Sequence, residues 1–146
     1  MTAPPIELTF ETEVAVPPAR LFEALTDARH LAHWFCDRAV SDPRPDGELV
    51  LAWDGPFSTR EPLRGRWTIV IAPVACAYRG GHSGYPDRDA GDVAFELRAI
   101  PAGTRLRTRH TMPGRPEYEP FATRYRAAWP RALARLAAYL APNPNI

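Results

Sequence analysis

The sequence predicts an α+β fold in which a curved antiparallel sheet of about six or seven strands wraps around a long carboxy-terminal helix. Three features of the sequence indicate this arrangement. Apolar and polar residues alternate from Ile6 to Val16, two short helical patterns follow without a gap, and an amphipathic helical pattern runs from Glu119 to Leu140. We expect residues 1–146 to form a single domain, with tails at residues 1–5 and 141–146.

The amino-terminal segment predicts a half-buried strand followed by two short helices. The alternation up to Val16 places apolar side chains on one face and glutamates on the other. Pro17 and Pro18 end this strand and preset the first turn of a short helix. Thr26-Asp27 offers a cap for a second helix that runs to Trp34, so we expect both helices to close one end of the sheet.

The middle of the chain predicts three further strands. Apolar residues alternate from Leu49 to Trp53, and residues 66–72 and 75–80 are expected to form two strands around a turn at Pro73. Loops are predicted at residues 38–47, at 54–56 where a strand ends, and at 57–63. The glycine-rich segment 80–91 is also predicted to be a loop, and we expect it to be mobile and to border a cavity mouth.

Residues 92–112 predict a hairpin that turns at Pro101-Ala102-Gly103. Pairing Ala99 with Thr104 sets a register for the whole hairpin. The inward pairs are then Leu97 with Leu106, Phe95 with Thr108, and Val93 with His110, whereas Arg105, Arg107, Arg109, Glu96 and Arg98 face water.

The last element is predicted to be a long amphipathic helix. Its apolar residues at helical spacing are Phe121, Tyr125, Trp129, Leu133, Leu136 and Leu140. Pro130 lies within this pattern and lacks a backbone donor, so it is expected either to kink the helix or to delay its start by one turn.

Four short motifs follow one another in the amino-terminal third: Val16-Pro17-Pro18-Ala19, Leu21-Phe22-Glu23-Ala24-Leu25, Thr26-Asp27 and Trp34-Phe35. In this order they resemble the opening of the START-like, or polyketide-cyclase and lipid-transport (SRPBCC), superfamily. The closest resemblance is to its branch of homologues of the activator of Hsp90 ATPase. The resemblance extends over nearly the whole chain, although Ala128-Trp129 stands where the family carries a Gly-Trp pair. It implies the helix-grip fold, known from Bet v 1, with a hydrophobic cavity between sheet and terminal helix.

Composition excludes several classes of function. The net charge is +1, which argues against the concentrated basic face of a nucleic-acid-binding protein. All 18 basic residues are arginine, so neither a Schiff-base lysine nor a phosphate-loop lysine is present. The two cysteines lie outside any CxxC spacing, and we see no apolar run that resembles a signal segment or a membrane span. We therefore expect a cytoplasmic protein without membrane insertion.

Aromatic residues are numerous enough to hold the helix away from the sheet and leave a cavity. The alternative is ordinary core packing of each ring. The candidate cavity residues are Trp34, Phe35, Trp53, Trp67, Tyr78, His82, Phe95, Thr108, His110, Phe121, Tyr125 and Trp129.

His110 is the polar residue of most interest, because the predicted register points it inward. Burial would favour its neutral form, whose imidazole could donate to and accept from a ligand carbonyl or hydroxyl. The alternative is a strand-end histidine bonded to the backbone or to water. His82, in a loop, could reach the cavity entrance, although a solvated side chain is the simpler interpretation.

A metal site, a cofactor site and a recognised catalytic motif are not expected. His30, His33 and Cys36 have a zinc-like spacing, but three positions at this interval drift around a helix by about 240 degrees and cannot converge on one ion. Neither Ser83 nor Gly80-Gly81 completes a nucleophile elbow or a dinucleotide-binding loop.

Three functions are therefore weighed. The first is noncatalytic binding of a small hydrophobic or aromatic ligand between sheet and helix. The second is an aromatase or cyclase type of enzyme, in which His110 with Tyr125 or Tyr78 moves protons. The third is a chaperone-interacting module, implied by the resemblance, for which an exposed apolar patch is expected. Oligomeric state stays open, and a homodimer is compatible with all three.

Overall fold

The computed structural model describes residues 3–54 and 61–141, and in them seven strands form one antiparallel sheet in the order β1-β7-β6-β5-β4-β3-β2. The strands are β1 (Ile6–Val14), β2 (Arg38–Ser41), β3 (Glu48–Ala52), β4 (Leu63–Ile71), β5 (Ala75–Gly81), β6 (Asp92–Ile100) and β7 (Gly103–Met112). The helices are α1 (Pro18–Thr26), α2 (Ala28–Trp34) and α3 (Glu119–Leu140), with short 3₁₀ turns η1 (Pro86–Arg88) and η2 (Pro116–Tyr118).

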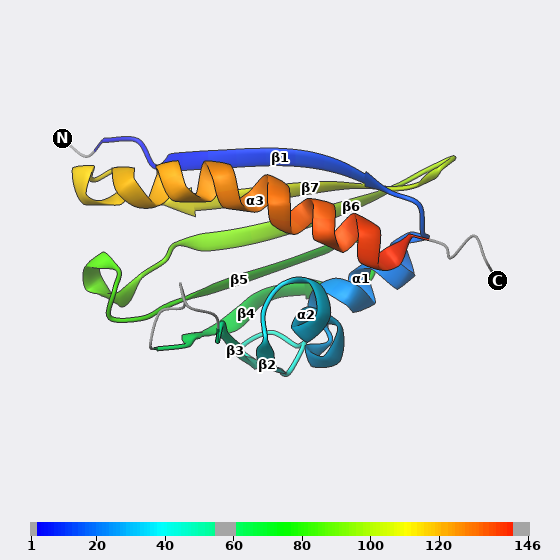
Figure 1. Ribbon diagram of the computed structural model, residues 1–146, viewed down its shortest axis with the longest axis horizontal. Helices are drawn as coiled ribbons and strands as arrows, with labels where there is room; N and C mark the ends of the chain where they lie inside the picture. The colour runs from blue at the N-terminus through cyan, green and yellow to red at the C-terminus, as the bar shows by residue number, and fades with distance from the viewer. Residues whose placement is uncertain (1–2, 55–60, 142–146) are drawn as a thin grey trace.

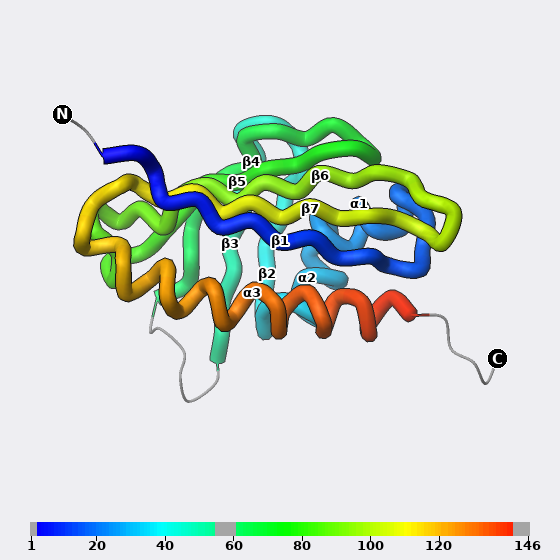
Figure 2. The backbone as a smooth tube through the Cα atoms, turned by 90° about the horizontal axis from the view of Figure 1, so that it is seen from above, coloured from blue at the N-terminus to red at the C-terminus, as the bar shows by residue number. Residues whose placement is uncertain are grey.

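The predicted fold class is confirmed. Figure 1 shows α3 running along the sheet beside β1, with α1 and α2 at one end near β2 and β3. Figure 2 shows from above how the sheet curves away from β1, so that α3 and the two short helices lie on its inner side. Three segments lie outside the described residues: 1–2, 55–60 and 142–146. They include parts of the predicted tails, the predicted strand end at 55–56 and the start of the predicted loop at 57–63.

The block between β1 and β2 forms as predicted from its prolines and its cap. Pro17 precedes α1, and Pro18 occupies its first turn. Asp27 separates the two helices, and its side chain accepts a hydrogen bond of 2.9 Å from the backbone N–H of Arg29 at the start of α2. The Trp34 indole then donates to the carbonyl of Ala24 at 2.9 Å, which ties α2 to α1.

The register of the β6–β7 hairpin is confirmed at each predicted pair. Ala99 pairs with Thr104, and the inward series continues to Val93 opposite His110. Gly103 begins β7 with a φ of 145°, a conformation that L side chains rarely adopt, so the glycine suits this turn. The outward residues Arg105 and Glu96 form ion pairs of 3.1 Å with Glu13 and 3.6 Å with Arg109, each worth only about 0–1 kcal/mol on an exposed surface.

One predicted loop contains a strand, and one strand begins earlier than predicted. The segment 38–47, predicted as a loop, contains β2, in which Val40 pairs with Val50 of β3. This edge strand alternates between exposed and half-buried residues, so it lacks the apolar alternation that marks a strand in sequence. The next strand, β4, begins at Leu63, which lies three residues before the predicted start at Arg66.

The terminal helix has the predicted bounds and continues through Pro130. A start delayed by one turn is therefore wrong. Pro120 occupies the first turn, where a missing N–H costs nothing, and Pro130 lies on the exposed side of the helix. None of the helices in the described part of the chain is long and apolar enough to span a membrane.

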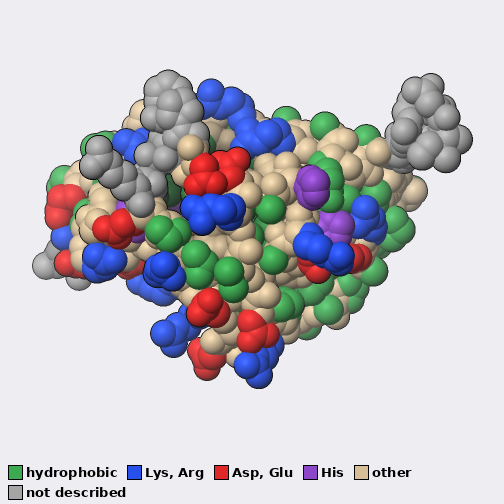
Figure 3. Space-filling model, turned by 60° about the horizontal axis from the view of Figure 1, so that its bottom comes forward, with side chains coloured by type: hydrophobic (Ala, Val, Ile, Leu, Met, Phe, Trp, Pro, Cys, Tyr) green, Lys and Arg blue, Asp and Glu red, His purple; other side chains and the backbone are tan. Residues whose placement is uncertain are grey.

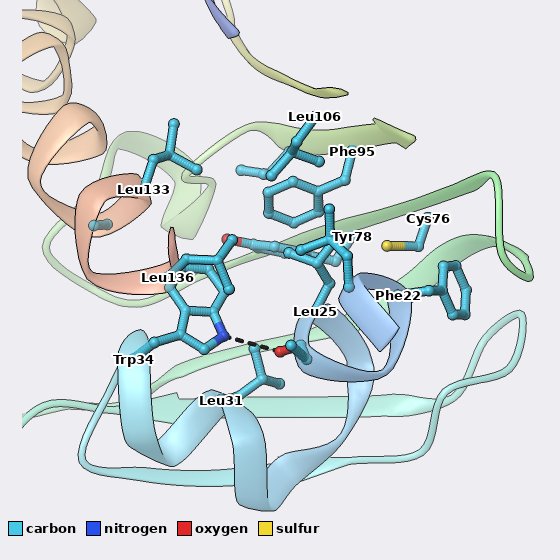
Figure 4. Packing of buried hydrophobic residues seen from close by; sticks show 14 of the residues in the cluster. Phe22, Leu25, Leu31, Trp34, Cys76, Tyr78, Phe95, Leu106, Leu133 and Leu136 are labelled. Carbon is cyan, nitrogen blue, oxygen red and sulfur yellow. Dashed lines mark hydrogen bonds between the residues drawn. The ribbon is translucent and has the colours of Figure 1, made fainter. Parts of the chain in front are cut away.

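The core lies between α3, the short helices and the inner face of the sheet. Figure 4 shows Leu133 and Leu136 of α3 facing Leu106 and Phe95 of the hairpin, with Trp34 beneath them. Figure 3 shows a different pattern on the face that carries β2, β3 and α2, where acidic and basic side chains are intermixed, in keeping with the small net charge.

We predict that Leu136→Ala lowers the free energy of unfolding by about 2–5 kcal/mol, because Leu136 is fully buried and its removal leaves a void in the core. Urea denaturation followed by tryptophan fluorescence measures the change. Thr123→Ala, at an exposed position of the same helix, is the control and should stay within about 0.5 kcal/mol of the parent protein. Equal losses in the two variants would contradict the assigned packing of α3.

Candidate functional site

A cavity of about 130 Å³ lies between α3 and the inner face of the sheet. Its walls come from α3, from the ends of α2 and β3, and from strands β4 to β7. The residues that line it are Phe35, Trp53, Leu63, Tyr78, Gly80, Ala90, Gly91, Val93, His110, Tyr125, Ala128, Trp129, Ala132 and Arg135. Most of these side chains are apolar, as is usual for a small-molecule site.

The helix lines the cavity with one stripe of residues. Tyr125, Trp129 and Ala132 follow one another at intervals of four and three, and Ala128 and Arg135 border the same stripe. Alanine side chains at two of these positions leave room that a leucine would fill. Gly91, across the cavity, has a φ of 90°, and a Cβ added there would lie 2.2 Å from the carbonyl oxygen of Thr111.

Three aromatic rings form one end of the cavity. Phe35 stacks on Trp129 with ring centroids 5.5 Å apart and meets the edge of Trp53 at 5.6 Å. The Trp53 indole donates a 2.7 Å hydrogen bond to the carbonyl of Phe35, which fixes both rings to the end of α2. We call Phe35, Trp53 and Trp129 the aromatic cage.

His110 has both ring nitrogens occupied. Nε2 lies 2.7 Å from the carbonyl oxygen of Ala90, which can only accept, so Nε2 carries the proton. Nδ1 accepts a 3.1 Å hydrogen bond from the indole N–H of Trp129. These two partners fix a neutral imidazole in one tautomer.

The environment of His110 disfavours its charged form. Burial is the main cause and lowers the pKa of His110, although the Ala90 carbonyl acts in the opposite direction. A second proton at Nδ1 would also face the indole N–H of Trp129. His110 therefore serves as a neutral bridge between β7, α3 and the loop before β6. Its predicted role as a free donor and acceptor for a ligand is not supported, since neither nitrogen is open.

Three tyrosines supply the other polar groups near the cavity. The hydroxyls of Tyr85 and Tyr125 are hydrogen-bonded to each other, which connects the loop after β5 to α3. Tyr78 is buried, and its hydroxyl has no hydrogen-bond partner among the described residues. Burial raises the pKa of Tyr78 and of Tyr125 far above the usual value, so both stay protonated. Tyr78 thus offers a phenolic donor inside an apolar cavity.

Half of the predicted cavity residues border the cavity: Phe35, Trp53, Tyr78, His110, Tyr125 and Trp129. Three others belong to the packed core instead. Trp34 bonds to Ala24, Phe95 meets Trp129 edge-on at 6.1 Å, and the Trp67 indole donates to the Ser41 hydroxyl at 3.0 Å. They were predicted as cavity residues, but other side chains of the core already fill the space around them.

The remaining predicted residues also lie away from the cavity wall. Nδ1 of His82 accepts from the backbone N–H of Gly84 at 2.9 Å, and its ring lies against Tyr85. Burial lowers the pKa of His82. Phe121 packs on Tyr85 at 4.7 Å. Thr108 is fully buried, and its hydroxyl has no hydrogen-bond partner in the described ranges.

The zinc-like spacing is explained by other contacts. His30 lies 2.7 Å from the Tyr139 hydroxyl and 3.2 Å from Glu23. His33 stacks on Tyr139 at 5.3 Å, whereas the thiol of Cys36 is buried and points to backbone carbonyls. Burial raises the pKa of Cys36 to about 11, so the thiol stays protonated. Residues 3–54 and 61–141 contain no group of three potential metal ligands.

The lining residues outside the predicted list of cavity residues are mostly small, and three of them lie in the segment 80–91 that was expected to border the cavity mouth. They are Leu63, Gly80, Ala90, Gly91, Val93, Ala128, Ala132 and Arg135. The alanines of α3 lie on the same helical stripe as Tyr125 and Trp129, and this spacing was a usable signal. Arg135 was missed because a charged residue on an amphipathic helix is usually solvated.

The family model described as Activator of Hsp90 ATPase homolog 1-like protein matches residues 15–141 of the chain. No curated protein matches this chain. Among solved structures, protein MLL2253 from Mesorhizobium loti is 20% identical with a TM-score of 0.79, over 92% of this chain and 96% of that one.

Two further solved structures share the fold. The Aha1 dimer from Colwellia psychrerythraea is 15% identical with a TM-score of 0.79, over 92% of this chain and 96% of that one. DynU16, a protein of the dynemicin biosynthetic locus, is 21% identical with a TM-score of 0.74, over 92% of this chain and 46% of that one. At these identities the likeness extends to the fold alone.

We predict that His110→Gln lowers the free energy of unfolding by about 1–3 kcal/mol at pH 7.5, because buried hydrogen-bonding groups lose their partner. The loss should shrink as the pH falls below about 6.5. In the parent protein the unfolded state binds a proton at His110 more readily than the folded state does, so acid removes this stability.

Urea denaturation of both proteins between pH 7.5 and pH 5 measures this difference. His33→Gln, at an exposed position of α2, is the matched control. A difference between His110→Gln and the parent that stays constant over this range would contradict a buried neutral imidazole.

Proposed function

Because the chain belongs to the family of Activator of Hsp90 ATPase homolog 1-like proteins, we propose that it binds a small apolar or aromatic ligand in the cavity between α3 and the sheet. The observation that carries this proposal is the preformed void of about 130 Å³, walled by aromatic rings and bordered by residues too small to fill it. No catalytic step is part of this function.

The size of the void limits the ligand. Drug-sized ligands occupy pockets of about 300–1,000 Å³, whereas an engineered apolar cavity of about 150 Å³ accepts benzene. A cavity of about 130 Å³ therefore suits a compound built on a single ring. The cage rings Phe35, Trp53 and Trp129 line this space, and offset or edge-on aromatic contacts with a ligand ring add about 0.5–1.5 kcal/mol beyond area burial.

The cyclase alternative has less support from the geometry. A general acid or base needs a nitrogen or oxygen within hydrogen-bond reach of the reacting atom. Both nitrogens of His110 are engaged by protein groups, and the raised pKa values of Tyr78 and Tyr125 make neither phenol a base near neutral pH. These residues are better suited to position a ligand than to move its protons.

We predict that single-ring compounds such as toluene, indole and benzyl alcohol raise the melting temperature of the protein, and that Ala128→Leu abolishes this effect. The larger side chain would occupy the void. Ligand at 100 times its Kd should add about 2.7 kcal/mol, or roughly 5–10 °C. Isothermal titration calorimetry gives the stoichiometry, and native mass spectrometry detects a copurifying ligand.

Ala127→Leu is the matched control, because Ala127 is exposed and lies next to Ala128 on the same helix. It should bind these compounds like the parent protein. Binding that survives in Ala128→Leu, or is lost equally in both variants, would place the ligand elsewhere. Absence of binding to any single-ring compound would remove the proposed function.

A second candidate is stimulation of a chaperone ATPase, favoured by one surface feature. Ile69, Ile71 and Val74 are 45%, 57% and 49% exposed around the turn between β4 and β5, where a soluble domain usually buries such residues. The family to which the chain belongs carries the activator of the Hsp90 ATPase in its description. A homodimer, as in the Colwellia psychrerythraea relative, is another arrangement that this apolar surface would serve.

We predict for this candidate that the protein raises the ATP turnover of an Hsp90-type chaperone and that Ile71→Glu reduces the stimulation. A charge at the centre of the apolar surface would oppose its burial against a partner. Val40→Glu is the control, because Val40 is 51% exposed on the edge strand β2, outside this surface. Unchanged ATP turnover with the parent protein would exclude this function.

A further inference from the structure

The charge at the cavity wall comes from a single side chain. Arg135 is the charged residue among those that line the cavity within the described ranges, and no aspartate or glutamate lines it there. Its Nε–H donates a 3.1 Å hydrogen bond to the carbonyl of Trp34, at the end of α2. The wall therefore has a fixed positive charge and no lining carboxylate to balance it.

Arg135 is an exposed residue that lines the same cavity as the aromatic cage, and its bond to Trp34 fixes its Nε next to the chain segment that carries Phe35. Trp34 immediately precedes Phe35 in the chain, and the Phe35 carbonyl is in turn held by the Trp53 indole. Arg135 and the cage are thus anchored to adjacent residues of the same chain segment. The two terminal Nη groups of Arg135 have no hydrogen-bond partner among the described residues, so they are available to a ligand.

Acidic residues near the cage are engaged elsewhere. Asp54 follows Trp53, but Arg38 donates to both of its carboxylate oxygens at 2.9 and 2.8 Å. Asp37 lies two residues after Phe35 and accepts from the backbone N–H of Asp54 at 2.7 Å. Neither carboxylate is paired with Arg135 in these contacts.

The remaining free polar groups at the cavity are also suited to an acceptor. The hydroxyl of Tyr78 has no protein partner in the described part of the chain. Of the mutually bonded pair Tyr85 and Tyr125, only Tyr125 lines the cavity, and its hydroxyl is engaged by that of Tyr85. By contrast, the indole N–H groups of Trp53 and Trp129 are already donated to the protein. An acceptor-rich ligand matches this set better than a donor-rich one.

From the charge and the free donors together, we propose that the cavity selects single-ring aromatic carboxylates, with the ring against the aromatic cage and the carboxylate bonded to the Arg135 guanidinium. This inference rests on the proposed ligand-binding function and names its ligand class. Guanidinium and carboxylate form paired N–H···O bonds, and Arg135 has two free nitrogen groups for them. A cationic ligand would face the same charge unfavourably.

The test compares benzoate, benzyl alcohol and benzylamine, which share one ring and differ in charge, by isothermal titration calorimetry. We expect benzoate to bind about tenfold more tightly than benzyl alcohol, as a partly solvent-screened ion pair allows, and benzylamine to bind most weakly. Added salt should weaken benzoate binding and leave benzyl alcohol unchanged.

Three variants separate the charge of Arg135 from its structural bond. Arg135→Gln should reduce benzoate affinity about tenfold without changing benzyl alcohol affinity, and Arg135→Lys, which keeps the charge, should retain most of the preference. Arg131→Gln, at an exposed arginine of the same helix that does not line the cavity, should leave both affinities unchanged. Melting temperatures verify that each variant is folded.

Equal affinity for benzoate and benzyl alcohol in the parent protein would overturn this inference and leave the proposed function intact. Equal losses for both compounds in Arg135→Gln would also overturn it, by assigning Arg135 a purely structural role. An effect of Arg131→Gln as large as that of Arg135→Gln would also overturn it, because general surface charge would then explain the preference for benzoate. If neither benzyl alcohol nor benzoate binds, the proposed function fails together with this inference.

Discussion

The hydrogen-bonded series from Trp129 through His110 to Ala90 is the interaction on which the arrangement around the cavity depends. It joins α3 to β7 and then to Ala90 in the loop before β6, and the Ala90 N–H continues it to the Gly80 carbonyl of β5 at 2.9 Å. Each group in the series has a partner, so a polar residue is buried without an unpaired nitrogen. Trp129 is also the ring on which Phe35 stacks. The spacing between helix and sheet is therefore set by directional bonds as well as by packing.

The sequence was sufficient to predict the fold because alternation and turn residues constrain a hairpin strongly. Fixing Ala99 opposite Thr104 determines every other pair of β6 and β7, and a shift by one residue would have turned Leu97 and His110 outward. The edge strand β2 escaped prediction for the opposite reason. Its residues Arg38–Ser41 are alternately exposed and half-buried and none is buried, so burial imposes no apolar pattern on them.

The candidate site could be predicted only in part. The sequence marks Trp34, Trp67 and Tyr78 as candidate cavity residues, but it does not indicate whether such a ring meets another side chain or empty space. The void itself arises at Gly80, Ala128 and other small residues, which carry little hydrophobic signal. For His110 the inward direction was predicted correctly, whereas its role depends on Trp129 and Ala90, two residues that are distant in sequence and were not linked to it.

The two alanines of α3 have a consequence for how ligand preference can change in this fold. The cavity is supported by the Trp129–His110 bond and by the buried core, which includes Ala132 but not Ala128. A substitution at Ala128 can therefore change the size of the cavity without removing these supports, whereas one at Ala132 also alters the core. Ligand preference and fold stability thus depend on different residues of α3. A related protein could therefore bind a different ligand after one or two substitutions at the cavity wall and keep the same fold.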